Sequence, residues 1–177
     1  MPDLLRPRHA GESMYFPCID DYFTEYNIQR KKALGQPFAP SLAGGGLAFL
    51  LEATRVAACM QIAAGCVISG TTDFYIVSHV DCGAYKYFAG VDWQEHSHDV
   101  QVASLWRDLH VAEATIREFL KSFNHPLDSS WVVPEVTFHL EVIDLGEQTV
   151  EKPNALTHAL DFSHYRGLPM TVFTAAK

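Results

Sequence analysis

The chain has 177 residues, with 13 Lys and Arg against 21 Asp and Glu, a formal net charge of −8 and 48% hydrophobic residues. This length predicts a single domain over residues 1–177, large enough to bury a core without disulfides or structural metals. The acidic balance excludes a nucleic-acid partner, because phosphates require a basic surface.

The first predicted element is a buried strand over residues 14–18, an apolar run that stops at Asp20 and Asp21. Residues 26–40 contain two prolines and three consecutive basic residues without a sustained period, which predicts a surface excursion. A helix is predicted to open at Gly44-Gly45-Gly46 and to end at Gly65 and Gly70. Its apolar positions, on one side of a 3.6-residue period, are Leu47, Leu51, Ala58 and Ile62.

Residues 74–78 form a β-branched and aromatic run without alternation, which is typical of a strand covered on both faces in a parallel sheet. A long amphipathic helix follows, with Ser97 or Asp99 as its N-cap, and it stops before Pro126. Its apolar stripe consists of Val102, Leu105, Leu109, Ala112, Ile116 and Phe119. Alternation over 136–142 predicts a half-buried strand near an edge of the sheet. Strands alternating with helices predict a mostly parallel α/β sheet flanked by helices, with no element assigned to residues 153–177.

Two features bear on the compartment. The basic N-terminus is not followed by an apolar run of secretory-signal length. The most apolar segment, 47–68, is interrupted by Glu52, Arg55 and Gln61, and so falls short of the run of about 20 that a membrane span needs. We therefore expect a cytoplasmic protein without a membrane partner, in which the cysteines are reduced.

Metal-binding residue types follow two of the predicted strands. Cys18 and Asp20 follow the first, and His79 and Cys82 follow the second. Because ligands bind at the carboxyl ends of parallel strands, these side chains are candidates for one site. Two thiolates and an imidazole suit Zn²⁺ better than Mg²⁺ or Ca²⁺. Asp81 is placed to cap a helix that starts at Gly83, and the N-terminus of that helix would favour a Cys82 thiolate.

The fourth zinc position would decide the function. Water there would have its pKa lowered to about 7 and become a hydroxide nucleophile, whereas a carboxylate there would close the site. The spacing alone is also compatible with a simpler interpretation. In that interpretation Cys18 and Cys82 are small buried residues and His79 is a hydrogen-bonded histidine at a strand end, which is the commoner role for such residues.

The motifs themselves resemble those of the β-class carbonic anhydrases. Cys18-Ile19-Asp20 is followed about sixty residues later by a strand that runs into His79-Val80-Asp81-Cys82-Gly83, and the resemblance extends over about residues 14–150. It implies that Cys18, His79 and Cys82 bind zinc and that Asp20 orients the zinc-bound hydroxide. It further implies reversible hydration of CO₂ to bicarbonate, and a homodimer or higher homo-oligomer.

The chain departs from the family pattern at the active site. Tyr22 stands where the family motif Cys-x-Asp-x-Arg has its arginine, and Ser41-Leu42-Ala43-Gly44 keeps only the last two residues of the family stretch Arg-Asn-Ala-Gly. In the family, the arginine pairs with the aspartate and holds it off the metal. A phenol offers one donor where a guanidinium offers a fork, so Asp20 is itself a candidate zinc ligand.

Three outcomes remain open at the sequence level. Arg6, Arg8 or Arg55 replaces the missing cation and the anhydrase works. Alternatively, the open site hydrolyses a related small electrophile such as carbonyl sulfide or carbon disulfide. In the third outcome Asp20 closes the site, and the protein is an inactive zinc-binding homologue.

Other residues have simpler interpretations. Cys59 and Cys66 would lie about 10 Å apart along a continuous helix, too far for a disulfide, and are predicted to be core residues. His96-Ser97-His98 is interpreted as the polar start of a helix in preference to a proton shuttle or second metal site. Gly44-Gly45-Gly46 could bind an anion on its backbone N–H groups, but it lacks the Lys of a phosphate loop. His139 is assigned to solvent exposure or sheet packing. Core packing is favoured over a pocket or subunit interface for Tyr85, Tyr87, Phe88 and Trp93.

Overall fold

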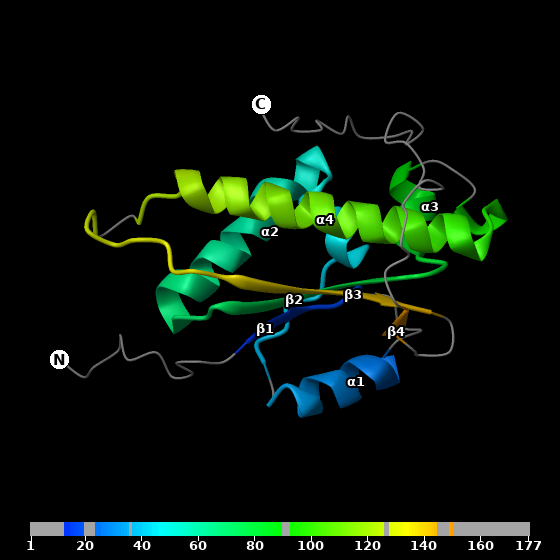
Figure 1. The fold of residues 1–177 in the computed structure, drawn as a ribbon, viewed down its shortest axis with the longest axis horizontal. Coiled ribbons are helices and arrows are strands. Elements are labelled where there is room, and N and C mark those ends of the chain that lie inside the picture. The colour runs from blue at the N-terminus through cyan, green and yellow to red at the C-terminus, as the bar shows by residue number, and fades with distance from the viewer. Residues whose placement is uncertain are drawn as a thin grey trace.

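The computed structural model describes residues 13–19, 24–35, 37–89, 93–125, 128–144 and 149–150. Within these residues the strands form one sheet in the order β1-β2-β3-β4 (Figure 1). The first strand, β1 (Met14–Phe16), and the third, β3 (Thr137–Ile143), lie on either side of β2 (Asp73–His79) and run parallel to it. The short β4 (Thr149–Val150) is antiparallel to β3. The predicted α/β architecture with a mostly parallel sheet is therefore confirmed.

The central strand β2 is buried on both faces, as its lack of alternation predicted. Phe74 and Ile76 belong to the main apolar core, whereas Val77 packs into a smaller cluster with Tyr15 and Ile143. Successive side chains of a strand point to opposite faces, so both faces of β2 require apolar residues. The position of β3 between β2 and the two-residue β4 also agrees with the prediction of a strand near the sheet edge.

The helix predicted from Gly44 to Gly70 is interrupted, which corrects the sequence prediction. A 3₁₀ turn, η2 (Gly45–Phe49), is followed by α2 (Glu52–Ala64) and a π-helical turn, η3 (Gly65–Ser69). The break lies at Leu51, whose ψ of 129° is extended. Gly70, with a φ of 64°, ends the π-turn in the left-handed region, as a C-terminal glycine does.

Close packing of η2 on the sheet explains the break. A Cβ atom on Gly45 would lie 1.8 Å from the Val77 carbonyl oxygen of β2, and one on Gly46 would lie 2.7 Å from the Leu109 side chain. The η2 turn therefore packs closely against both β2 and α4, and the chain changes direction before α2 begins. The Thr54 hydroxyl donates a hydrogen bond to the Ala48 carbonyl across the interruption at 2.7 Å.

The long amphipathic helix, α4 (His98–Ser122), is confirmed with its predicted limits. Ser97 occupies the N-cap position without a side-chain capping bond, and Phe123 occupies the C-cap position. Together with α2, α4 covers one face of the sheet (Figure 1). The predicted apolar positions of α4 are buried except Phe119, which is partly buried against the core. A shorter helix, α3 (Gly83–Ala89), and a 3₁₀ turn, η4 (Trp93–Glu95), connect β2 to α4.

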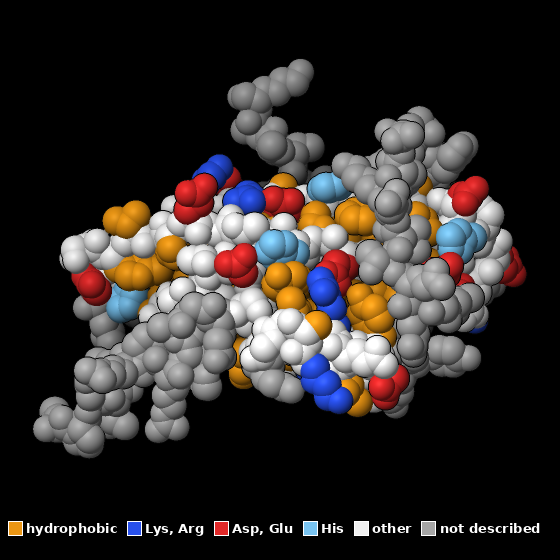
Figure 2. Space-filling view, turned by 60° about the horizontal axis from the view of Figure 1, so that its bottom comes forward, with side chains coloured by type: hydrophobic (Ala, Val, Ile, Leu, Met, Phe, Trp, Pro, Cys, Tyr) orange, Lys and Arg blue, Asp and Glu red, His pale blue; other side chains and the backbone are white. Residues whose placement is uncertain are grey.

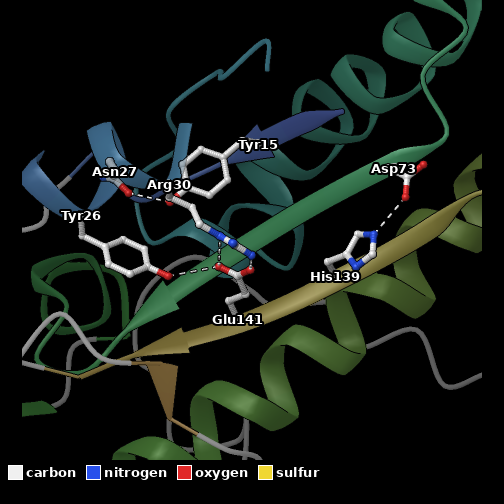
Figure 3. Close-up of polar contacts among 7 residues, drawn as sticks. All are labelled: Tyr15, Tyr26, Asn27, Arg30, Asp73, His139 and Glu141. Atoms are coloured by element: carbon white, nitrogen blue, oxygen red, sulfur yellow. Dashed lines mark hydrogen bonds and ion pairs between the residues drawn. The ribbon is translucent and has the colours of Figure 1, made fainter. Parts of the chain in front are cut away.

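Helix α1 (Thr24–Ala33) corrects the prediction of an irregular surface excursion. It lies on the opposite face of the sheet from α2 and α4 (Figure 1) and buries none of its residues. Polar groups attach it to the sheet: Arg30 and Tyr26 both contact Glu141 of β3 (Figure 3). Because the helix has no buried apolar stripe, its sequence shows no 3.6-residue period. The basic residues of its last turn do interact favourably with the helix dipole.

The charge distribution on the surface and the apolar character of the helices are relevant to possible binding partners. On the face drawn in Figure 2, Lys and Arg side chains are interspersed with Asp and Glu side chains. Within the described residues, no helix is both long enough and apolar enough to cross a bilayer. The elements described here build one small α/β domain.

Candidate metal centre

Cys18, His79 and Cys82 lie together at the carboxyl end of the parallel strands. One ligand atom from each residue lies within 4.8 Å of the others, and all three residues are buried. The two sulfur atoms are 3.7 Å apart. The sequence prediction that these residues converge is confirmed, and the group can hold a metal ion.

The position of Cys18 is fixed by a bridge just beyond β1. The Leu42 carbonyl accepts a hydrogen bond from the Ile19 N–H at 3.2 Å, and the Leu42 N–H donates to the Pro17 carbonyl at 3.0 Å. The next turn brings the Gly44 N–H to 3.2 Å from the Cys18 sulfur. A donor aimed at the sulfur stabilises the thiolate, which is the form that binds metals.

A tight turn after β2 carries the other two candidate ligands. The Val80 N–H donates to the Ile143 carbonyl of β3 at 2.9 Å, which keeps the start of the turn on the sheet. Asp81 has a φ of 57°, the left-handed region that non-glycine residues seldom occupy. Its N–H donates to Gln101 Oε1 at 2.9 Å, and Gln101 Nε2 donates back to Asp81 Oδ1 at 3.1 Å. The Asp81 carboxylate, predicted to cap α3, thus bonds to α4.

The His79 ring has a defined orientation. Its Nδ1 lies 2.9 Å from the Val80 carbonyl oxygen. A carbonyl can only accept, so Nδ1 carries the proton in the neutral ring and Nε2 carries the lone pair. Metal-binding histidines are commonly oriented by such a bond to a carbonyl.

The pair of thiols changes the acidity of Cys82. The neighbouring Cys18 thiol, then burial, raise the pKa of Cys82 well above its usual value of 9.0, against the opposing effect of the Ala84 and Tyr85 N–H groups. Two thiolates in one buried pocket repel each other and lose hydration. A divalent cation would supply the missing positive charge and release the protons, so the pocket couples metal binding to deprotonation.

The remaining residues of the first motif lie outside the described part of the chain. These are Asp20 and Tyr22, together with Arg6 and Arg8, two of the predicted replacement cations. The third, Arg55, is half-buried on α2, and its charge opposes part of the rise that burial causes in the pKa of Cys59. Cys59 and Cys66 are buried core residues, as predicted, and burial raises their pKa values to about 12 and about 11.

The glycine run does not form the anion cradle that its sequence allowed. The Gly44 N–H points to the Cys18 sulfur, the Gly45 N–H to the Leu42 carbonyl, and the Gly46 N–H to the Ser78 hydroxyl. These donors are used within the protein and help to fix Cys18 beside β2.

The histidines near α4 belong to the polar start of that helix, in agreement with the preferred interpretation. His98 Nε2 lies 3.1 Å from Asp144 Oδ2, and the His96 ring contacts the edge of Trp93. Among the described residues, the group of three metal-binding side chains that could hold an ion is Cys18, His79 and Cys82, and neither of these histidines belongs to it.

His139 packs on the sheet. Its ring stacks on Tyr75 at 4.2 Å between centroids, and its Nε2 lies 3.0 Å from Asp73 Oδ1 (Figure 3). Of the aromatic residues after Cys82, Tyr85 and Trp93 are fully buried and stacked, whereas Tyr87 is 82% exposed, so core packing is wrong for Tyr87.

A buried polar stripe on α4 was not identified in the sequence. It consists of Gln101, Ser104 and Asp108, all buried beside the predicted apolar stripe. Asp108 Oδ2 accepts the Tyr85 hydroxyl at 2.9 Å and Gln101 contacts Asp81. Their spacing of three and four residues places them on one face of the helix, but it does not say whether that face is buried.

Comparison with known proteins adds no assignment: no family model matches the chain, and no curated protein matches it.

Proposed function

We propose that the protein is a zinc-dependent lyase of the carbonic-anhydrase type, which catalyses the reversible hydration of CO₂. The observation that carries this proposal is the convergence of Cys18, His79 and Cys82, the three residues that match the metal-binding positions of the β-class motif. They come from two adjacent parallel strands. His79 is the last residue of β2, Cys82 follows it, and Cys18 lies just beyond the end of β1.

The distance between the sulfurs fits a zinc ion bound between them. Two sulfurs about 2.3 Å from a tetrahedral zinc lie about 3.8 Å apart. The observed separation between Cys18 and Cys82 is 3.7 Å. A set of two sulfurs and one imidazole also matches the preference of zinc over the hard cations Mg²⁺ and Ca²⁺.

The chain supplies binding and orientation around that metal. Cys18, His79 and Cys82 would hold it, and three protein ligands leave one coordination position for a reactant. Zinc bound in this way supplies Lewis acidity, which lowers the pKa of water at the open position towards 7. Cys18 and Cys82 also belong to the main apolar core, an environment suited to a small neutral substrate such as CO₂.

Asp20 is the proposed catalytic residue. It follows Cys18 by two positions, and a carboxylate oxygen there would accept a hydrogen bond from the hydroxide that attacks CO₂ and would orient it. Solvent would take up the proton that water releases when this hydroxide forms.

Tyr22 favours a second candidate function. Without the motif arginine, Asp20 is free to act as the fourth zinc ligand, which would make the protein an inactive zinc-binding homologue. Carbonyl sulfide or carbon disulfide hydrolysis is a third outcome, in which the fourth position stays open but the pocket takes a different electrophile.

Stopped-flow CO₂ hydration on zinc-loaded protein, from pH 7 to 9, tests the proposal. We expect a rate above buffer that scales with bound zinc and is lost in Cys82→Ser but retained in Cys66→Ser, a buried cysteine outside the metal-binding group. A protein that binds zinc stoichiometrically but shows no CO₂ hydration would contradict the proposed anhydrase activity. The same assay with carbonyl sulfide and carbon disulfide would then distinguish another substrate from a closed site.

We further propose that the protein forms a homodimer or higher homo-oligomer, as the family resemblance implies. Sedimentation equilibrium of the full chain tests this assembly, and a monomer at micromolar concentration would contradict it.

A further inference from the structure

We propose that Gln101 of α4 is a positioning residue for the metal-binding turn, and that Asp108 supports the same turn through Tyr85. This inference rests on the proposed metal site and names the residues outside the ligand set that set its geometry.

The turn from His79 to Cys82 needs an external support at Asp81. Val80 is held by the backbone of β3, but the Asp81 N–H points away from the sheet and bonds to Gln101 Oε1 at 2.9 Å. Asp81 is also the described non-glycine residue with a positive φ. Aspartate adopts this conformation more readily than most non-glycine residues, but the conformation still costs free energy that contacts with the surroundings must offset.

Gln101 is built to give that support. Its side chain amide accepts from the Asp81 N–H and donates to the Asp81 carboxylate at 3.1 Å, which closes a two-bond ring around one residue. The same Nε2 donates to the His96 carbonyl at 3.1 Å. Gln101 is only 3% exposed, so water cannot replace these bonds.

Asp108 acts on the other side of Cys82. It is fully buried, and its Oδ2 accepts the Tyr85 hydroxyl at 2.9 Å, while Arg107 binds its Oδ1 at 3.1 Å. Tyr85 in turn donates its N–H to the Cys82 carbonyl at 3.1 Å. Two buried polar residues of one helix thus hold the residues immediately before and shortly after Cys82.

The geometry assigns these contacts to metal binding because Cys82 must keep its sulfur near that of Cys18. A rotation of the turn at Asp81 would move Cys82 relative to His79, and both must reach one ion. Groups that orient metal ligands typically change metal affinity by about 10- to 100-fold when they are removed.

Cobalt binding to the full-length protein tests the inference, with Co²⁺ as the spectroscopic probe. We expect Gln101→Leu to weaken Co²⁺ affinity by about 10- to 100-fold in chelator competition and to alter the visible and sulfur-to-cobalt absorption bands. Tyr85→Phe, which keeps the ring stacked on Trp93, should give a smaller loss. Thr115→Val on the same helix is the control, because the Thr115 hydroxyl donates its hydrogen bond within α4, to the Val111 carbonyl.

The variants also separate this inference from the proposed function. If the wild-type protein binds Co²⁺ and Gln101→Leu binds it equally, with the same spectrum, Gln101 is not a positioning residue although the metal site stands. If the wild-type protein binds neither Co²⁺ nor Zn²⁺, both proposals fail.

A charge-swapped pair keeps the test decisive if Gln101→Leu does not fold. Gln101→Glu sets two carboxylates against each other, and adding Asp81→Asn returns a donor from position 81 to the new acceptor. We expect Gln101→Glu to lose Co²⁺ affinity and the double variant to recover most of it. Equal affinities in these two variants would overturn the inference.

Discussion

Arg30 on α1 forms a two-pronged ion pair with Glu141 on β3, through Nε and a second guanidinium nitrogen (Figure 3). Glu141 is buried, while the Arg30 side chain is 31% exposed. Tyr26 donates a further bond to the same carboxylate at 3.3 Å. This relationship attaches α1 to the sheet, although none of the residues of α1 is fully buried.

Replacing Arg30 should therefore destabilise the protein more than replacing Glu141 by its amide. Arg30→Ala leaves a carboxylate buried beside the sheet, and we expect a loss of about 2 to 3 kcal/mol, less than a fully buried pair because Arg30 is partly solvated. Glu141→Gln should cost about 1 kcal/mol, because an acceptor remains. Urea unfolding measures both. Lys121→Ala, which breaks the exposed pair with Glu118, should change stability by less than about 0.5 kcal/mol.

Zinc should stabilise the protein through the two sulfurs. At a thousandfold excess over its dissociation constant, a ligand that binds only the folded state adds about 4 kcal/mol. We expect thermal unfolding to shift upwards with zinc in the wild type and in Cys66→Ser, and to stay unshifted in Cys82→Ser. A shift retained in Cys82→Ser would place the ion elsewhere.

Tyr22→Arg tests whether Asp20 occupies the fourth zinc position. If Asp20 is a ligand, a guanidinium at position 22 should draw it off the metal and raise the CO₂ hydration rate. Tyr22→Phe is the matched control, because it removes the phenol oxygen without adding a cation. An equal rate in the wild type and Tyr22→Arg would contradict the closed site.

The Asp73 and His139 pair gives a prediction at acidic pH. The hydrogen bond from His139 is the main cause that lowers the Asp73 pKa below its ordinary value of 3.8. Stability from this pair is therefore fully present above the unfolded value and is lost as the pH falls through the lower folded pKa. His139→Phe should raise the Asp73 pKa in a carboxyl NMR titration.

A second depressed carboxyl provides the control for that titration. Ser130, through its hydroxyl and then its N–H, lowers the pKa of Asp128. Ser130→Ala should raise the Asp128 pKa and leave Asp73 unchanged, while His139→Phe should do the reverse. Parallel shifts of both carboxyls in either variant would show that the local contacts are not the cause.

Gly45 should tolerate no side chain. Gly45→Ala sets a Cβ atom against the Val77 carbonyl at a φ of 53°, and we expect a loss of more than about 3 kcal/mol in unfolding experiments. Gly83→Ala is the contrasting variant, because nothing lies within 4 Å of its Cβ position and its backbone has no positive φ. Similar losses in the two variants would contradict the close approach of η2 to β2.

The elements that bury apolar side chains could be predicted from the sequence. β2 and α4 were recognisable because burial imposes a pattern on their residues, and the strand ends then placed Cys18, His79 and Cys82 together. α1 was not recognisable as a helix, because Arg30 and Tyr26 attach it through polar contacts that leave no apolar period.

Other features depend on contacts between distant segments. The break at Leu51 follows from the approach of Gly45 to Val77, and neither residue signals it locally. The support of Asp81 by Gln101 joins residues 20 positions apart, and its amide could have faced solvent as readily from the sequence alone. Burial of polar side chains is a tertiary property, so the pattern of one helix does not determine their partners.

The two sulfurs of the metal-binding group are 64 positions apart in the chain. If both sulfurs bound one ion in the unfolded chain, the segment between Cys18 and Cys82 would be closed into a loop, at a chain-entropy cost of roughly 4 kcal/mol. In the folded protein, the parallel pairing of β1 with β2 has already brought the loop ends together. A metal ion would therefore act as a cross-link between the first strand and the centre of the sheet, one that resists the departure of the N-terminal strand.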